Sequence, residues 1–200
     1  MKRIMFVGPS GIGKTTLAKF IETKYGIPFI SGSMSDLMPD TKEMHHAEFL
    51  HQECGELINK DYQLLNLRNK LFKDKETFVT DRSYVDLAAY FIYKQSTNIP
   101  ECEVDAFLDI CKDLTVQQCD LLIYLPLSMY HMKEWPMEDN KKRIINRYYQ
   151  AQMSDIMGNL LTQWSTLSVI GSTLSVIDNI LVVPQLDFYD RIHMIMSRLD

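Results

Sequence analysis

The sequence has little cysteine and no long apolar run. None of its four cysteines belongs to a Cys-x-x-Cys pair, and their placement in a chain of 200 residues indicates no disulfide framework. The apolar stretch after residues 1–3 is too short for a signal peptide, and no later segment reaches the length of a membrane span. We therefore expect reduced thiols in a cytoplasmic protein that makes no contact with a membrane.

Basic residues are also in the minority. The chain has 21 lysines and arginines against 26 acidic residues, and its net charge of −5 argues against a broad nucleic-acid-binding surface. A local basic groove is still compatible with that charge. A hydrophobic content of 46% fits one α/β domain with an ample core. We expect a single domain over residues 1–200 that binds small molecules, with the oligomeric state open and a homodimer included.

Glycine is scarce, yet three of the 8 glycines gather between Gly8 and Gly13. The pattern Gly-x4-Gly-Lys-Thr follows the apolar run of residues 4–7 and precedes a helical periodicity, which is the context of a phosphate-binding loop. Lys14 is expected to reach the β- and γ-phosphates of ATP, and the Thr15 hydroxyl to ligate Mg²⁺. The predicted nucleotide-binding residues are Gly8, Pro9, Ser10, Gly11, Ile12, Gly13, Lys14, Thr15 and Thr16.

Apolar strands alternate with helical periodicity along the rest of the chain. Strands are predicted at residues 26–30, 77–80 and 120–125, and helices at 41–72 with a break near 59–61, at 84–95, 101–117, 141–164 and 187–199. The hexapeptide at residues 165–170 recurs at 172–177, which we interpret as a local duplication before a last strand. This order indicates a three-layer, doubly wound parallel sheet of about five strands.

Ligands of such a sheet bind beyond the carboxyl ends of its strands. The small-residue loop at 31–36 follows the predicted second strand, so it is expected to face the phosphate-binding loop, and Asp36 is a candidate for acceptor contact. The helices at 41–72 are expected to cover the acceptor side.

Asp81-Arg82-Ser83 closes the predicted strand at 77–80, and Ser83 with Asp86 forms a helix N-cap signature. With these residues and the phosphate-binding loop, the chain resembles the P-loop nucleoside and nucleotide kinases, particularly thymidylate-kinase-like enzymes and the small P-loop kinases of phages. The resemblance implies that Asp81 holds magnesium or acts as a base toward an acceptor hydroxyl. It also implies that Arg82 clamps an acceptor phosphate. The alternative is an ion pair that only caps the helix.

A mobile lid is implied by the same resemblance at residues 126–147, after the predicted strand at 120–125. Arg143 and Arg147 lie one turn apart in the predicted helix, so both are expected to reach the transferring phosphate as catalytic residues. The alternative is that the basic run from Lys141 is a solvated helix start.

Other residues with site chemistry give weaker patterns. His45, His46, His51 and Cys54 do not form a matched pair of metal ligands on one helix face, so we expect no structural zinc. Tyr84, Tyr90 and Tyr93 could stack on a base, but their helical spacing is also typical of core or rim packing.

The leading functional hypothesis is an ATP- and magnesium-dependent kinase of a small acceptor, foremost a nucleoside or deoxynucleoside monophosphate. One alternative acceptor is a hydroxyl, either of a nucleoside or of a hydroxymethylated base in DNA. A second alternative is an NTPase that hydrolyses without transfer. Asp120 precedes the apolar run at 121–124 instead of following it, so no Walker B strand is evident, which favours a kinase.

Overall fold

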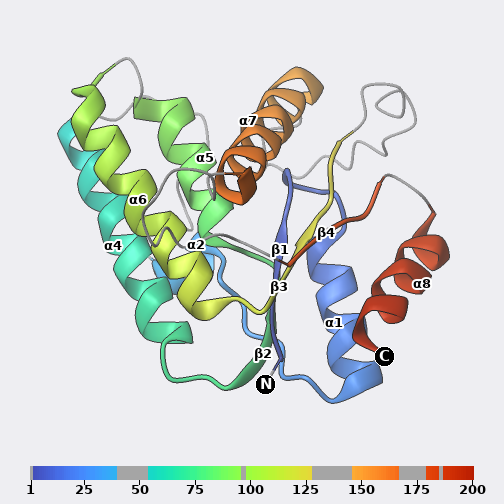
Figure 1. The fold of residues 1–200 in the computed structure, drawn as a ribbon. Coiled ribbons are helices and arrows are strands. Elements are labelled where there is room, and N and C mark those ends of the chain that lie inside the picture. The colour runs from blue at the N-terminus through green and yellow to red at the C-terminus, as the bar shows by residue number, and fades with distance from the viewer. Residues whose placement is uncertain (1, 40–53, 96–97, 128–145, 167–178, 185–186) are drawn as a thin grey trace.

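A parallel sheet separates two layers of helices in the computed structural model, which describes residues 2–39, 54–95, 98–127, 146–166, 179–184 and 187–200 (Figure 1). The strands are β1 (Lys2–Val7), β2 (Thr77–Thr80), β3 (Leu121–Tyr124) and β4 (Ile180–Val182). The helices are α1 (Lys14–Tyr25), α2 (Met34–Leu37), α4 (Cys54–Phe72), α5 (Tyr84–Gln95), α6 (Glu101–Gln118), α7 (Arg147–Thr166) and α8 (Phe188–Leu199). The three-layer, doubly wound α/β fold expected from the sequence is confirmed.

The strand order β2-β1-β3-β4 puts β1 inside the sheet, with parallel neighbours on both sides. From β1 the chain crosses to β2 on one side and later to β3 on the other. Ligands of open α/β sheets bind where this direction reverses, which here is the carboxyl end of β1. The glycine-rich loop leaves the sheet at that point.

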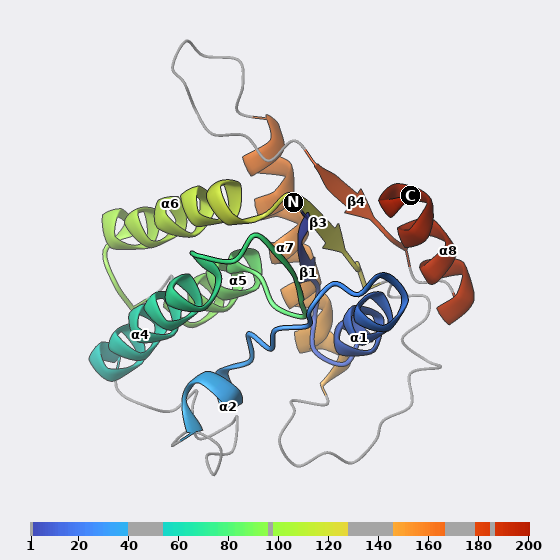
Figure 2. The same ribbon diagram turned by 90° about the horizontal axis from the view of Figure 1, so that it is seen from below.

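Alternate residues of β1 face the two helical layers, as strand geometry requires. Ile4 and Phe6 pack in one cluster with α1 and α8, whereas Met5 and Val7 pack in another with α4, α5, α6 and α7. Figure 2 shows α1 and α8 on one side of the sheet and α4, α5 and α6 on the other. None of the four side chains is more than 1% exposed, so β1 is buried on both faces and fixes the direction in which the loop departs.

The strand predicted at residues 26–30 is reduced to a single bridge between Phe29 and Val79. Pro28 has no N–H for a further bond to β2, and the N–H of Phe29, which points away from β2, donates to Glu22 Oε1 (2.9 Å). The segment still runs beside β2, because Ile30 N donates to Val79 O and Val79 N donates to Pro28 O, each at 2.9 Å. Among the described residues, four strands and this bridge therefore stand where about five strands were expected.

Two helix predictions were wrong in detail. α4 continues without a break through residues 59–61, because Asp61 is buried and accepts two hydrogen bonds from Lys94 of α5 (2.5 and 2.7 Å). The helix predicted over 141–164 is interrupted at Asn146, which lies outside α7 (Arg147–Thr166) and whose side chain accepts from the N–H of Tyr148 (2.9 Å); residues 141–145 lie outside the described residues. The expected small-residue loop also contains the short helix α2.

Several predictions fall on residues that the structure does not describe. These are the part of the acceptor-side helices at 40–53, most of the lid segment at 128–145, and the repeat within 167–178. In the described ranges, no helix is both long and apolar enough to cross a membrane.

Candidate active site

The glycine-rich loop needs glycine at its start for steric reasons. A Cβ on Gly8 would lie 2.6 Å from the carbonyl oxygen of Leu125, where the loop passes the end of β3. Gly13, at the other end, has a φ of +96° and is the N-cap of α1. The loop therefore curls over the N-terminus of α1, where backbone N–H groups and the helix dipole favour an anion.

The side chain of Lys14 is held inside the curve of the loop. Its ammonium group donates to the carbonyl oxygens of Gly8 and Pro9 and lies 3.9 Å from Asp86 Oδ1. Lys14 is only 5% exposed, so its charge is directed toward the loop interior and not toward bulk solvent. The position matches the one expected for a lysine that contacts a phosphate chain.

Thr15 and Asp81, the two predicted metal ligands, lie in direct contact. The hydroxyl of Thr15 donates to Asp81 Oδ2 at 2.5 Å, and Asp81 is buried at the end of β2. The other oxygen, Asp81 Oδ1, is buried and has no hydrogen-bond partner in the described part of the chain. A buried carboxylate oxygen without a partner is unfavourable, and oxygen ligands of this kind suit Mg²⁺. The pair therefore fits the metal that the sequence implied.

Asp86 connects the phosphate-binding loop to the start of α5. Its Oδ2 accepts from the N–H and hydroxyl of Ser83 (2.9 and 2.6 Å), and its own N–H donates to Ser83 Oγ (3.1 Å), which completes the predicted cap. Its Oδ1 faces Lys14 and accepts a long hydrogen bond from the N–H of Gly8 (3.4 Å). The sequence pattern indicated only a capping role for Asp86, because its contact with the loop depends on how α5 packs against β1.

Arg82 follows Asp81 and is half-buried. Burial lowers the pKa of its guanidinium, but Tyr90 and the carboxylates of Asp86 and Asp81 outweigh this effect, so the pKa is raised overall. Arg82 is therefore a permanent cation at the carboxyl end of β2, beside the phosphate-binding loop. A guanidinium at this position attracts anionic groups.

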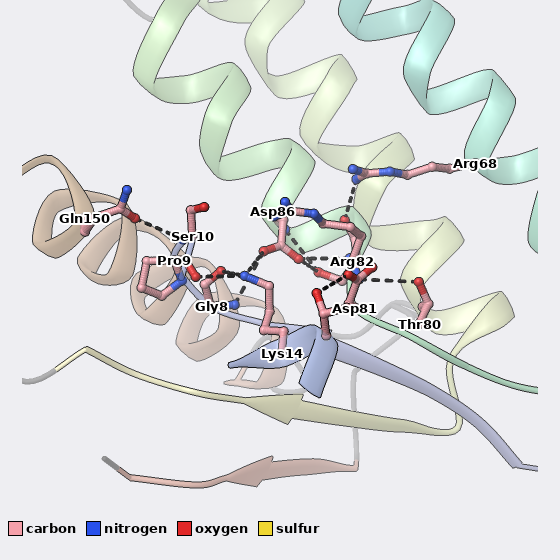
Figure 3. A network of polar contacts seen from close by, with 12 residues as sticks. Gly8, Pro9, Ser10, Lys14, Arg68, Thr80, Asp81, Arg82, Asp86 and Gln150 are labelled. Atoms are coloured by element: carbon pink, nitrogen blue, oxygen red, sulfur yellow. Dashed lines mark hydrogen bonds and ion pairs between the residues drawn. The ribbon is translucent and has the colours of Figure 1, made fainter. Parts of the chain in front are cut away.

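A second arginine, Arg68 of α4, reaches the same turn and was not singled out in the sequence. It is 4% exposed, and it donates from Nε to Gly32 O and from Nη1 to Ser83 O, both at 2.9 Å. Burial and the neighbouring charge of Arg82 lower the pKa of Arg68 to about 10, so the group is still a cation at neutral pH. Figure 3 shows Arg68 approaching the Asp81–Asp86 network from the side away from Lys14.

The first turns of α7 dock onto the loop and the end of β3. Gln150 is buried and its Oε1 accepts from the N–H of Ser10 (2.9 Å). One turn later, Ser154 Oγ accepts from the N–H of Leu127 (2.9 Å), and Tyr124 donates to the carbonyl oxygen of Ser154 (2.8 Å). Gln150 and Ser154 therefore anchor α7 to the loop and to the end of β3.

Of the two predicted lid arginines the structure describes only Arg147, and its contacts in the described part of the chain do not reach the loop. Arg147 is the first residue of α7, is exposed, and lies with its guanidinium carbon 5.1 Å from the centre of the Tyr148 ring. Arg143 lies outside the described residues. The shared helix face that was to place both side chains is interrupted at Asn146.

The remaining candidates have local contacts. Asp36 is exposed and accepts from the hydroxyls of Ser31 (2.5 Å) and Ser33 (2.8 Å), so it shapes the loop before α2. Tyr84 is fully buried and donates to Gln118 (2.7 Å), which makes it a core residue. The three histidines at 45, 46 and 51 lie outside the described residues, as does the side chain of Cys54.

Arg191 of α8 supports the loop from the other helical layer. Its Nη1 donates to the carbonyl oxygen of Ile12 (2.8 Å), while its Nε is buried without a hydrogen-bond partner among the described residues. No motif marks Arg191, because the contact joins residues at opposite ends of the chain.

Comparison with known proteins shows which family the chain belongs to. The profile of a family described as AAA domain matches residues 3–173. An adenylate kinase from Blochmanniella pennsylvanica is 38% identical over 73 residues, which cover 34% of this chain and 34% of that protein. The chain therefore matches about a third of the length of this curated relative.

Solved structures of kinases superpose on almost the whole chain. A deoxyadenosine kinase from M. mycoides with bound dATP gives a TM-score of 0.66 at 17% identity, over 100% of this chain and 99% of that one. A thymidylate kinase from Candida albicans gives a TM-score of 0.54 at 14% identity, over 98% and 88% of the two chains. At these identities the likeness shows a shared fold.

Proposed function

Because this chain belongs to the AAA-domain family and has the fold of P-loop nucleoside and nucleotide kinases, we propose that it transfers a phosphoryl group from ATP to a small nucleotide-like acceptor. The acceptor we favour is a nucleoside or deoxynucleoside monophosphate. The resemblance to P-loop nucleoside and nucleotide kinases is thus confirmed for family and fold. The identity of the acceptor is our proposal.

The contact between Thr15 and Asp81 carries this proposal. It joins the end of the phosphate-binding loop to the end of β2, and leaves Asp81 Oδ1 buried without a partner in the described residues. Thr15 and Asp81 would hold Mg²⁺, directly or through water. When bound, the metal ion would neutralise charge on the β- and γ-phosphates.

The chain's own residues supply the remaining electrostatic help. Backbone N–H groups of residues 11–16 and the ammonium of Lys14 would bind the phosphate chain and stabilise the charge that develops on the transferring group. Asp86 and Gln150 would hold the loop in shape through Gly8 and Ser10. Phosphoryl transfer needs little covalent chemistry from the protein, so positioning and charge account for most of the catalysis.

Arg82 favours a phosphate-bearing acceptor. A guanidinium matches two oxygens of a phosphate monoester at once, and Arg82 lies next to Asp81 on the side of the loop covered by α4 and α5. Asp81 is turned toward Thr15, which supports a metal role more than the role of a base for an acceptor hydroxyl. The lid role of Arg143 and Arg147, and acceptor contact by Asp36, stay predictions.

A hydroxyl acceptor is the second candidate. The observation in its favour is the same buried Asp81 Oδ1, because an unpartnered carboxylate oxygen could accept the proton of a nucleoside hydroxyl or of a hydroxymethylated base in DNA. Hydrolysis without transfer is the third candidate, and it would require no acceptor.

A coupled assay of ADP release separates these candidates. The purified protein is tested with ATP and Mg²⁺ against all nucleosides, their monophosphates and a DNA duplex with hydroxymethylated bases. Stimulation by one or more monophosphates is the expected result. Stimulation by nucleosides alone would indicate that the acceptor is a nucleoside hydroxyl. Stimulation by the duplex, with binding that weakens steeply as salt is raised, would indicate a hydroxymethylated base in DNA. ADP release that no acceptor stimulates would favour an NTPase.

A further inference from the structure

We propose that Arg68 is a positioning residue of the acceptor site, which fastens the loop at 31–33 to the turn that carries Arg82. The inference rests on the proposed function, because it assumes that the acceptor binds beside Arg82. Neither the motifs nor the sequence resemblance assigns any role to Arg68.

The environment of Arg68 is unusual for a buried cation. A buried guanidinium is normally paired with a carboxylate, because removing a charge from water is costly. Arg68 donates to two backbone carbonyls instead, and no carboxylate lies within 4.0 Å of it in the described ranges. This arrangement is explained if the function of the Arg68 guanidinium is to hold the two loops together through its hydrogen bonds.

The two bonded carbonyls belong to segments that are far apart in the sequence. Gly32 precedes α2, and Ser83 precedes α5, so one side chain of α4 ties together the two loops at the acceptor side of the sheet. The planar guanidinium fixes the direction of both hydrogen bonds at once, which an ammonium cannot do.

Gly32 gives independent support for this arrangement. A Cβ at this position would lie 3.0 Å from the Cβ of Arg82, 3.2 Å from Thr80 Oγ1 and 3.3 Å from the ring of Phe72. The backbone of the loop is therefore packed directly against Arg82. By holding Gly32 in place, Arg68 limits where the Arg82 side chain can go.

The charge of Arg68 also matters for an anionic acceptor. Burial is the main cause that lowers the pKa of Arg68, repulsion by Arg82 adds to it, and the carboxylate of Asp86 partly offsets both. A phosphate group beside Arg82 would relieve the repulsion, whereas an uncharged nucleoside would not. The pair thus favours a phosphate monoester even if Arg68 never touches it.

The test compares Arg68→Lys, Arg68→Gln and Arg68→Met by steady-state kinetics with the acceptor that the wild type uses. Arg68→Met should raise the acceptor KM about tenfold or more, the loss expected for charge-assisted hydrogen bonds, with little change in the KM for ATP. Lysine keeps the charge and should recover part of the affinity, and glutamine should recover less. Lys70→Met is the matched control, because Lys70 is an exposed cation of the same helix.

Gly32→Ala tests the same contact without removing a charge, and it keeps the proposal testable if Arg68→Met fails to fold. The added methyl group should push the loop away from Arg82 and raise the acceptor KM without affecting the KM for ATP. An unchanged acceptor KM in Arg68→Lys and Gly32→Ala, with a lower melting temperature only, would overturn the inference and leave the proposed function intact. Absence of transfer by the wild type would overturn the proposed function, and the inference with it.

Discussion

The Thr15 hydroxyl donates a 2.5 Å hydrogen bond to Asp81 Oδ2, although the two residues are 66 positions apart. The bond joins the first turn of α1 to the end of β2, which lie together because β2 pairs directly with β1. It also leaves Asp81 Oδ1 as the buried oxygen for which the described residues supply no donor. The arrangement predicts how substitutions on each side of the site will behave.

Lys14→Ala should abolish most of the activity. We expect a loss of about 3 kcal/mol of transition-state stabilisation, roughly a hundredfold in rate, because the ammonium neutralises charge on the transferring phosphoryl group. Single-turnover kinetics would measure the rate, and circular dichroism would establish that the variant is folded. Turnover close to the wild-type value would contradict the kinase proposal.

Asp81→Asn should change the metal dependence of the reaction. An amide oxygen can still accept from Thr15, but it is a weaker magnesium ligand than a carboxylate, so activity should fall and the Mg²⁺ concentration at half-maximal rate should rise. Titration with Mg²⁺ and Mn²⁺ at saturating ATP measures this effect. If neither ion recovers any activity, Asp81 acts as a base and the acceptor is a hydroxyl.

Arg82→Lys should raise the KM for a monophosphate acceptor strongly and leave the KM for ATP unchanged. The charge is kept, but an ammonium cannot reproduce a planar two-pronged contact with two phosphate oxygens. Initial rates over a grid of both substrates give the two constants separately. An unchanged acceptor KM, together with activity on unphosphorylated nucleosides, would shift the acceptor to a hydroxyl.

Gln150→Met should weaken donor binding in particular. The substitution removes the acceptor of the Ser10 N–H while keeping a long side chain of similar size, and a lost hydrogen bond of this kind is worth about 1 kcal/mol, or roughly fivefold in the KM for ATP. Gln152→Met is the control, because Gln152 is exposed on the same helix. Equal effects of the two substitutions would show that the contact with Ser10 does not matter for ATP.

Lys94→Met should destabilise the fold by about 3 to 5 kcal/mol, the cost of leaving one partner of a buried ion pair alone. Burial raises the pKa of Asp61 above its unfolded value, and Lys94 partly offsets this shift. Without the lysine the pKa rises further, so the variant should be most stable at acidic pH and lose stability as pH rises through that value.

Urea unfolding of Lys94→Met at several pH values measures this trend. The double variant Asp61→Leu/Lys94→Met should recover most of the lost stability, because an apolar pair needs no desolvation of charge. A loss of stability that persists in the double variant and does not depend on pH would assign the effect to packing.

The sequence by itself determined the parts of this protein that depend on neighbouring residues. The Gly-x4-Gly-Lys-Thr pattern between an apolar run and a helical periodicity predicted the loop, and four apolar or β-branched residues bounded by turn residues predicted β2 at Thr77–Thr80. The Ser83–Asp86 helix cap could also be predicted from the sequence, because both residues lie within one helical turn. In each case a few adjacent side chains decide the backbone conformation.

Only the tertiary structure decided which long side chains reach the phosphate-binding loop and the turn at residues 81–83. Arg68, Gln150 and Arg191 lie on three different helices and contact Ser83, Ser10 and Ile12. No spacing in the sequence connects these pairs, since each contact depends on how a helix packs against the sheet. In the same way, the side chain of Glu22 accepts from the N–H of Phe29, which points away from β2. Local patterns specify the elements, whereas the partners of a buried polar group are set by whichever elements the core brings together.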